Sequence, residues 1–272
     1  MGKSSSEAFL LFKHLKHTLV PFRDAGEEPS DFECSVTDCL EGLERAIALG
    51  WYNFLAFDYK EFEHNHKLEH GDMNWLIPKK ILALSSPTDT KSEGLPPQFF
   101  ISKFKKMRIK AIVRLNEPLY DISPFTLAGI KVYDLEFLDG SCPSDEVIIR
   151  FGSICEREIK YGGGAIAVHC RAGLGRTGTL IGTYLMHRYN FEPKPLIAWL
   201  RIARPGSVIG IQQNFLVEVQ QRIKKLHFSS KHPYVRKYDV EEEEEENMYV
   251  GEKKRRGLSE VKFEQAKFGG SQ

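Results

Sequence analysis

The chain has 272 residues, 42% of them hydrophobic and 28% charged, a composition typical of a globular protein with a packed core. The net charge of +1 gives no reason to expect nucleic acid or an anionic membrane as the main partner, and no apolar run is long enough to cross a bilayer. Five cysteines at irregular spacing exclude a disulfide framework and a zinc finger, so we expect a reduced protein of the cytoplasm or the nucleus.

The first part of the chain predicts a small helical piece. Apolar side chains recur at helical spacing in residues 8–20, and residues 37–50 form a second predicted helix with Thr37 or Asp38 as its cap. A polar, histidine-rich stretch follows, and we expect a linker helix over 60–74. The pattern therefore predicts helices alone ahead of the main domain.

Strands and helices alternate from Trp75 onward. This alternation predicts an α/β fold, with a central, mostly parallel sheet flanked by helices. The predicted strands are 80–85, 110–115, 130–136 and 164–169, and the predicted helices are 97–107, 145–160, 176–189, 194–203 and 210–226.

Blocks of like charge follow the last predicted helix. Residues 241–246 are six consecutive glutamates, and residues 253–256 read KKRR. Such blocks cannot bury a core, so we expect residues 229–272 to be disordered. The basic block is either a short nuclear import signal or ordinary solvated tail charge.

Residues 168–180, VHCRAGLGRTGTL, carry the chemistry. A buried strand is expected to end just before Cys170, and Gly173 and Gly175 then permit a tight loop that opens a helix near Arg176. Successive backbone N–H groups of such a loop point inward, which forms a phosphate site and favours a thiolate nucleophile. The predicted phosphate-binding residues are Arg171, Ala172, Gly173, Leu174, Gly175 and Arg176.

Two further side chains of this segment have predicted roles. The planar guanidinium of Arg176 can hold two phosphate oxygens, and the hydroxyl of Thr177 can ease departure of the sulfur in a second step. The alternative is a structural Cys170 in a glycine-rich turn between strand and helix. Neither role requires a metal or a cofactor.

A cysteine nucleophile needs a general acid, because serine and threonine alkoxides are poor leaving groups. The candidate is Asp139, in the string FLDGSCPSD, on a loop that can fold over the phosphate. The alternative is that Asp139 merely forms a turn with Gly140, and Asp145 is a rival acid that better fits a helix cap. Downstream, Gln212 and Gln213 either orient the hydrolytic water or lie on a solvated helix face.

These strings resemble the cysteine-based dual-specificity phosphatases, and in particular the mitotic-exit phosphatases of the cell-division-cycle-fourteen type. The resemblance covers about residues 20–222. The matching strings are PFRDAG (21–26), DCLEGLERAI (38–47), FDYKEFEH (57–64), HGDMNWLIPKKILALS (70–85), VRLN (113–116), FLDGSCPSD (137–145), GAIAVHCRAGLGRTGTL (164–180) and IAWLRIARPGSVIGIQQNFL (197–216).

The resemblance implies that Cys170 is the nucleophile, that Arg176 binds phosphate and that Asp139 is the general acid. It also implies a preference for phosphoserine followed by proline, as in the substrates of proline-directed kinases, with a basic residue further on. In that family an acidic groove selects the basic residue, and here Glu61 and Glu63 match part of it. Their alternative reading is a solvated helix face.

The chain also departs from the family pattern. Only about the last third of the family's inactive N-terminal domain is present, and His66 stands where a glutamate is usual in the linker. The expected organisation is a remnant of that domain over 1–59, the linker helix over 60–74, the catalytic domain over 75–228 and the tail over 229–272.

Three functions remain open on the sequence. The first is a phosphatase for phosphoserine and phosphothreonine in proteins, with phosphotyrosine as a further substrate. The second is a phosphoinositide or RNA 5′-triphosphate phosphatase, which Leu174 disfavours because inositide enzymes usually have a lysine in such a slot. The third is a phosphopeptide-binding scaffold. A membrane is expected as a partner only if Gly2, which fits an N-myristoylation pattern, is acylated.

Overall fold

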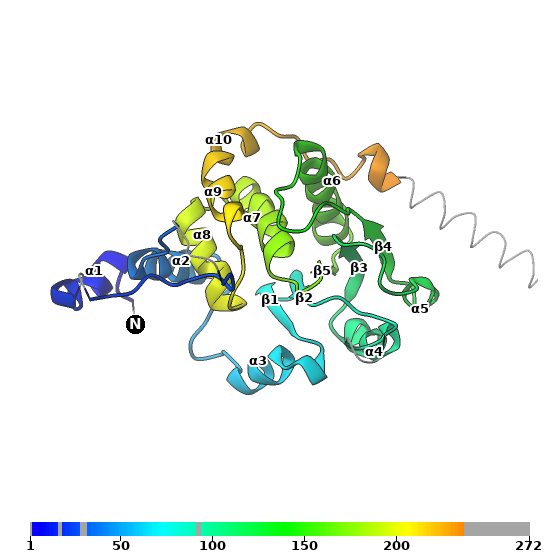
Figure 1. Cartoon of the computed structure of the whole chain (residues 1–272), viewed down its shortest axis with the longest axis horizontal. Helices are drawn as coiled ribbons and strands as arrows, with labels where there is room; N and C mark the ends of the chain where they lie inside the picture. The colour runs from blue at the N-terminus through cyan, green and yellow to red at the C-terminus, as the bar shows by residue number, and fades with distance from the viewer. Residues whose placement is uncertain (1, 16–17, 28–31, 91–93, 237–272) are drawn as a thin grey trace, which may run out of the picture. The chain divides into compact units, whose positions relative to one another are not determined.

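The computed structural model describes residues 2–15, 18–27, 32–90 and 94–236 (Figure 1). The chain up to Ser230 forms one compact unit, and beyond it only a helical turn at 233–236 is described. The greater part of the predicted disordered tail, from residue 237, therefore lies outside the described residues. None of the described helices is long and apolar enough to span a membrane.

The core of this unit is a five-stranded sheet with the strand order β1-β2-β5-β3-β4. Only the edge pair β1 and β2 is antiparallel, so the predicted mostly parallel α/β fold is confirmed. All four predicted strands are present, whereas β1 was not predicted. The strands are β1 (Met73–Ile77), β2 (Ile81–Leu84), β3 (Ile109–Arg114), β4 (Lys131–Asp134) and β5 (Ala165–His169).

Ten α-helices are described around the sheet, and several differ from the predicted ranges. The predicted helix 8–20 is wrong as a single element, because a helix capped by Ser4 ends at Leu10 and a separate 3-10 turn follows. The helices are α1 (Ser5–Leu10), α2 (Val36–Ala48), α3 (Tyr59–His66), α4 (Pro97–Lys106), α5 (Ser123–Leu127), α6 (Asp145–Cys155), α7 (Gly175–Tyr189), α8 (Pro193–Ala203), α9 (Ile211–Glu218) and α10 (Gln220–Ile223).

Local sequence explains the helix ends. Ser35, rather than Thr37 or Asp38, caps α2: its hydroxyl accepts from the backbone N–H of Asp38, whose carboxylate accepts from the N–H of Ser35. The predicted helix 210–226 is divided into α9 and α10 at Val219. Helix α6 continues as a π-helical segment, Glu156–Tyr161, before the turn that leads to β5.

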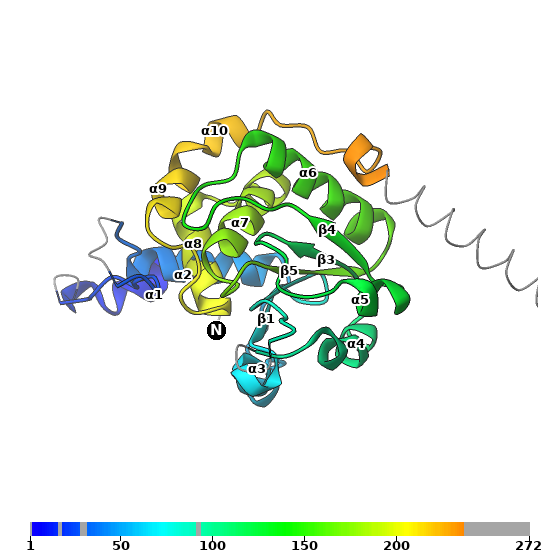
Figure 2. The same cartoon turned by 45° about the vertical axis from the view of Figure 1, so that its right-hand side comes forward.

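Helices cover both faces of the sheet (Figure 2). On one face, Phe100 and Phe104 of α4 and Phe125 of α5 pack against buried aliphatic side chains of β2, β3 and β5. Helices α6 and α7 lie on the other face. The central strand β5 is consequently buried at every position, which holds its end in a fixed place.

The N-terminal segment packs directly against helices α7 and α8. Helix α2 lies so close to α8 that a Cβ atom on Gly42 would meet the carbonyl oxygen of Pro195 at 2.3 Å. The ring of Trp51 contacts those of Tyr189 and Trp199, with centroid distances of 5.0 and 6.2 Å. Hydrophobic and aromatic packing therefore ties the first fifty residues to the rest of the unit.

The predicted linker helix is shorter than expected. Helix α3 ends at His66, a 3-10 turn spans Leu68–His70, and Met73 already begins β1. Residues 60–74 thus hold a helix, a turn and the start of a strand. The domain boundaries at 59, 74 and 228 stay predictions, because residues 1–230 form one unit.

Candidate active site

The carboxyl ends of the parallel strands carry the candidate site. Leu84 of β2 and Arg114 of β3 both lie opposite His169, the last residue of β5. Cys170 follows directly and is 3% exposed. The phosphate loop, defined here as residues 170–176, then leads into the first turn of α7. A buried thiol thus lies where a strand end meets a helix N-terminus, which is the expected place for an anion in an open α/β sheet.

Three consecutive carbonyl groups of the phosphate loop are bound by residues outside the loop. That of Arg171 accepts from the N–H of Ser86 at 2.9 Å. Those of Ala172 and Gly173 accept from the guanidinium of Arg204 at 2.9 and 2.8 Å. Since each peptide unit places its N–H opposite its carbonyl group, the amides that follow these three carbonyl groups face the inside of the turn. This orientation applies to the amides of Ala172, Gly173 and Leu174, and phosphate binding by the loop stays a prediction.

Gly173 allows this turn. Its φ of +67° lies in the left-handed region, and a Cβ atom there would meet the carbonyl oxygen of Leu84 at 1.9 Å. Only glycine permits both this backbone conformation and this approach to β2. The phosphate loop therefore lies directly against strand β2 at Gly173.

A buried pair fixes the strand end below the sulfur. The Nδ1 atom of His169 lies 3.1 Å from the carbonyl oxygen of Cys170, and its Nε2 atom lies 2.9 Å from the hydroxyl of Tyr120. Burial lowers the pKa of His169 to about 4, so the ring is neutral. Because Nδ1 faces an acceptor, it carries the proton, and Tyr120 donates to Nε2. Tyr120 was missed by sequence reasoning, since no motif connects it with His169.

The predicted acid and the predicted phosphate ligand lie together. Arg176 is 3% exposed, and its Nη1 atom donates to the carbonyl oxygens of Leu115 and Phe137 at 3.2 and 3.0 Å. Its Nε atom lies 3.1 Å from Oδ1 of Asp139, whose side chain is 73% exposed. The loop carrying Asp139 therefore reaches over the phosphate loop with its carboxylate at the solvent side.

Two other predicted residues can be placed from their partners. The hydroxyl of Thr177 is buried and has no hydrogen-bond partner among the described residues, so it is free for a group inside the site. Asp145, the rival acid, is the first residue of α6 and pairs with Arg222 at 2.9 Å. The cap of that helix is Ser144, not Asp145. The structure thus brings Asp139, and not Asp145, to Arg176.

The two predicted water-positioning residues have different surroundings. The side-chain oxygen of Gln212 lies close to Gly175 in the phosphate loop, since a Cβ atom added to Gly175 would lie 2.9 Å from it. The NH₂ group of Gln212 donates to the carbonyl oxygen of Ser141 at 2.9 Å, in the loop that carries Asp139, called the acid loop below. Gln213 instead accepts from the buried guanidinium of Arg201. The amide of Gln212 therefore bridges the phosphate loop and the acid loop, whereas that of Gln213 belongs to a supporting network.

That network includes a residue of the N-terminal segment. Asp24 accepts from the side-chain NH₂ of Gln213 and from the backbone N–H of Gly210, both at 2.8 Å. Arg201 also donates to the carbonyl oxygen of Phe22. Sequence reasoning missed Asp24, although it lies in the matched string PFRDAG; only the fold shows that this string supports the turn before α9.

Glu61 and Glu63 lie exposed on α3. Helix α3 packs against β1, which carries it near the edge of the sheet (Figure 1). The substrate-groove role of these two glutamates stays a prediction.

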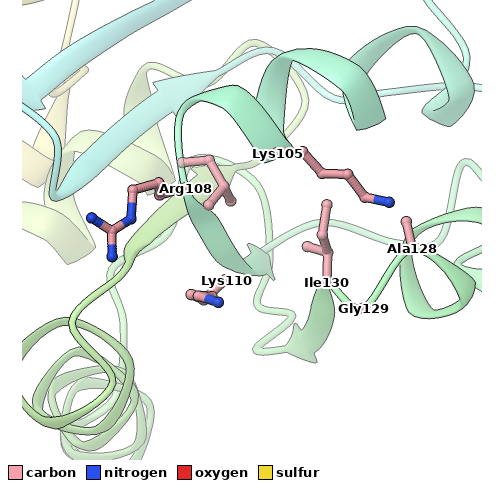
Figure 3. Close-up of a pocket in the computed structure, with 7 residues that line it drawn as sticks. Lys105, Arg108, Lys110, Ala128, Gly129 and Ile130 are labelled. Atoms are coloured by element: carbon pink, nitrogen blue, oxygen red, sulfur yellow. The ribbon is translucent and has the colours of Figure 1, made fainter.

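A separate hollow of about 170 Å³ lies at the opposite ends of the strands (Figure 3). It is lined by the start of β3 and by the turn before β4, including Lys105, Arg108 and Gly129. The basic side chains spread around the hollow and do not converge on one point, as Figure 3 shows. Cys170 lies at the other ends of the strands, because it follows the last residue of β5.

Comparisons with known proteins agree with this geometry. The family described as “Dual specificity protein phosphatase, N-terminal half” matches residues 1–46, and that described as “Polymorphic toxin system, DSP-PTPase phosphatase” matches residues 90–189. The solved structure of kinase associated phosphatase shares the fold, with a TM-score of 0.50 and 18% identity over 58% of this chain and 98% of that one.

Curated relatives give the closer similarity. The human “Dual specificity protein phosphatase CDC14A” is 48% identical over 226 residues, which are 81% of this chain and 37% of that protein. The “Tyrosine-protein phosphatase cdc-14” of Caenorhabditis elegans is 43% identical over 81% of this chain and 31% of that protein. The chain thus spans only about a third of the length of these relatives. Over that stretch, it belongs to the CDC14 type of dual specificity protein phosphatases.

Proposed function

We propose that this chain hydrolyses phosphoserine and phosphothreonine esters in proteins through a phosphate bound covalently to Cys170. One observation carries the proposal: Cys170 is buried at the start of the phosphate loop, and Arg176, at the end of that loop, lies 3.1 Å from the carboxylate of Asp139. A nucleophile, an oxyanion site and a proton donor within one edge of the sheet are the parts that phosphoryl transfer requires.

In the first step, the thiolate of Cys170 attacks phosphorus and the bond to the serine or threonine oxygen breaks. The amides of the phosphate loop and the guanidinium of Arg176 hold the three equatorial oxygens, where negative charge is spread in the transition state. Asp139 gives its proton to the leaving oxygen, so the alcohol departs neutral. Arg176 is held for this task by two backbone carbonyl groups.

In the second step, water attacks the cysteinyl phosphate. Asp139, now ionised, takes a proton from the water, and Gln212 orients the water from its place between the two loops. The buried hydroxyl of Thr177, which has no other partner among the described residues, donates to the sulfur as it leaves. Gln213 is not assigned this role, because its amide binds Arg201 and Asp24.

Substrate choice follows from the surface around the site. Glu61 and Glu63 are exposed on α3 and supply negative charge that can attract a basic residue beyond the phosphorylated one. We propose that the preferred substrates are the sites that proline-directed kinases phosphorylate, in which a phosphoserine is followed by proline. Arg171, which is exposed, is the single cation of the phosphate loop besides Arg176. The loop therefore offers little positive charge to bind the further phosphate groups of an inositide.

The test compares two substrates. Cys170→Ser should abolish turnover while phosphopeptide binding remains. Asp139→Ala should slow a phosphoserine peptide by about 100-fold or more but an activated aryl phosphate far less, because that leaving group needs no proton. Asp145→Ala is the matched control, because Asp145 is a half-buried carboxylate a few residues further along that pairs with Arg222 instead of Arg176. Equal losses on both substrates would remove Asp139 from the acid role, and full activity of Cys170→Ser would end the proposal.

A further inference from the structure

Arg204 is a buried cation that binds the carbonyl groups on the outer side of the phosphate loop. It is 1% exposed and follows directly after α8. Its Nη2 and Nε atoms donate to the carbonyl oxygens of Ala172 and Gly173 at 2.9 and 2.8 Å. These two bonds orient consecutive peptide units of the loop, and so also the amides on its inner side.

The same guanidinium is anchored on the stretch between α3 and β1. Its Nη1 and Nη2 atoms donate to the two carboxylate oxygens of Asp72 at 3.0 and 2.9 Å, and Nη1 also donates to Oδ1 of Asn74 at 2.8 Å. Asp72 has a φ of +42°, which is uncommon for a residue other than glycine. A strained backbone kept in place by a paired guanidinium indicates a rigid anchor.

The side chain of Asn74 continues the connection to α3. Its Oδ1 atom lies 3.2 Å from Nδ1 of His66, the last residue of that helix, so one oxygen accepts from two donors. The opposite orientation of the amide would place its NH₂ group against the N–H of Arg204, two donors facing each other, so this orientation is fixed. His66 must therefore donate from Nδ1. The ring of His66 also stacks on that of Phe62, with the centroids 5.9 Å apart.

We infer that Arg204 is a positioning residue, which holds the phosphate loop in its anion-binding conformation, and that Asn74 and His66 connect this clamp to helix α3. The inference rests on the proposed function, since it takes the loop as the site of the substrate phosphate. It assigns to α3, the helix that carries Glu61 and Glu63, a second role besides contact with substrate. A change in the position of α3 alters how tightly the loop holds phosphate.

The experiment measures binding of tungstate, a tetrahedral oxyanion, to the intact chain by calorimetry, so that no turnover is needed. Arg204→Lys keeps the charge but cannot reach both loop carbonyls and Asp72 together, and it should weaken tungstate binding about 10-fold or more. Arg201→Lys is the matched control, because Arg201 is equally buried and binds Gln213 and backbone carbonyls outside the loop. It should lower the melting temperature and leave tungstate binding within about 2-fold.

His66→Phe tests the connection to α3. It keeps the stacking on Phe62 and removes the Nδ1 donor, so tungstate binding should weaken about 3-fold in the natural background and remain unchanged in the Arg204→Lys background. An equal effect of His66→Phe in both backgrounds would overturn the connection. Tungstate binding of Arg204→Lys that matches Arg201→Lys would overturn the clamp. A chain that binds tungstate as expected but cleaves no phosphopeptide would refute the proposed function and leave the clamp intact.

Discussion

Replacement of Gly173 by alanine tests how tightly the phosphate loop is seated on the sheet. The added methyl group would lie 1.9 Å from the carbonyl oxygen of Leu84, where ordinary contact begins at about 3.4 Å, so the two segments must separate by about 1.5 Å. Leu84 is paired with His169 across the sheet and cannot move far without breaking that pairing. The loop must therefore move, and its amides move with it.

The expected cost has two parts. The left-handed backbone at φ +67° costs an alanine about 1–2 kcal/mol of folding free energy. Misplacement of binding groups by about 1 Å costs about 100-fold in rate, so we expect kcat/KM to fall at least about 100-fold. Turnover of an aryl phosphate reports the rate, and urea unfolding reports the stability.

The matched control is Gly129→Ala. Gly129 has a similar φ of +75°, but a Cβ atom there would have no neighbour within 4 Å. It should lose about 1 kcal/mol of stability and retain its kcat/KM. If Gly173→Ala keeps kcat/KM within about 3-fold of the natural chain, the close approach to Leu84 does not determine the geometry of the site.

Three further predictions concern other parts of the molecule. The fold lowers the pKa of His169 to about 4, so the unfolded chain takes up the proton at a higher pH than the folded chain. As the pH is lowered from about 6.5 to about 4, the free energy of unfolding should therefore fall by about 3 kcal/mol. In urea unfolding, His169→Asn should flatten this part of the dependence of stability on pH, and an unchanged dependence would contradict the buried neutral ring. Gln212→Ala should slow breakdown of the cysteinyl phosphate about 10-fold and produce a burst of alcohol release, whereas a burst with Gln213→Ala instead would reverse the two assignments. Gly42→Ala should lower the free energy of unfolding by about 1–3 kcal/mol in chemical denaturation, because its methyl group would strike the backbone at Pro195; unchanged stability would mean that α2 and α8 are not in close contact.

Local patterns were sufficient for the parts of the fold that depend on local chemistry. The apolar run before Cys170 predicted β5, and the glycines after it predicted the loop and the start of α7. Strand β1 was missed because it lies at the sheet edge and directly follows polar residues of the linker. Its place depends on antiparallel pairing with β2, which no period within its own residues can reveal.

The supporting residues of the site could not be predicted for a related reason. Gln212 and Gln213 are neighbours in the sequence, yet only their distant partners distinguish them: the acid loop for the first, and Asp24 and Arg201 for the second. A buried arginine such as Arg204 resembles any charged residue in a sequence pattern. Its function is visible only when the carbonyl groups that it binds are known.

The position of Asp24 limits which fragment of this chain can fold and act without the rest. A fragment that begins near Trp75 would keep the cysteine, the arginine and the acid. It would lose the carboxylate that binds the NH₂ group of Gln213, and the carbonyl group of Phe22 that satisfies Arg201. A buried guanidinium deprived of acceptors is costly, so the smallest self-sufficient catalytic piece has to include the strip of chain around residues 21–26.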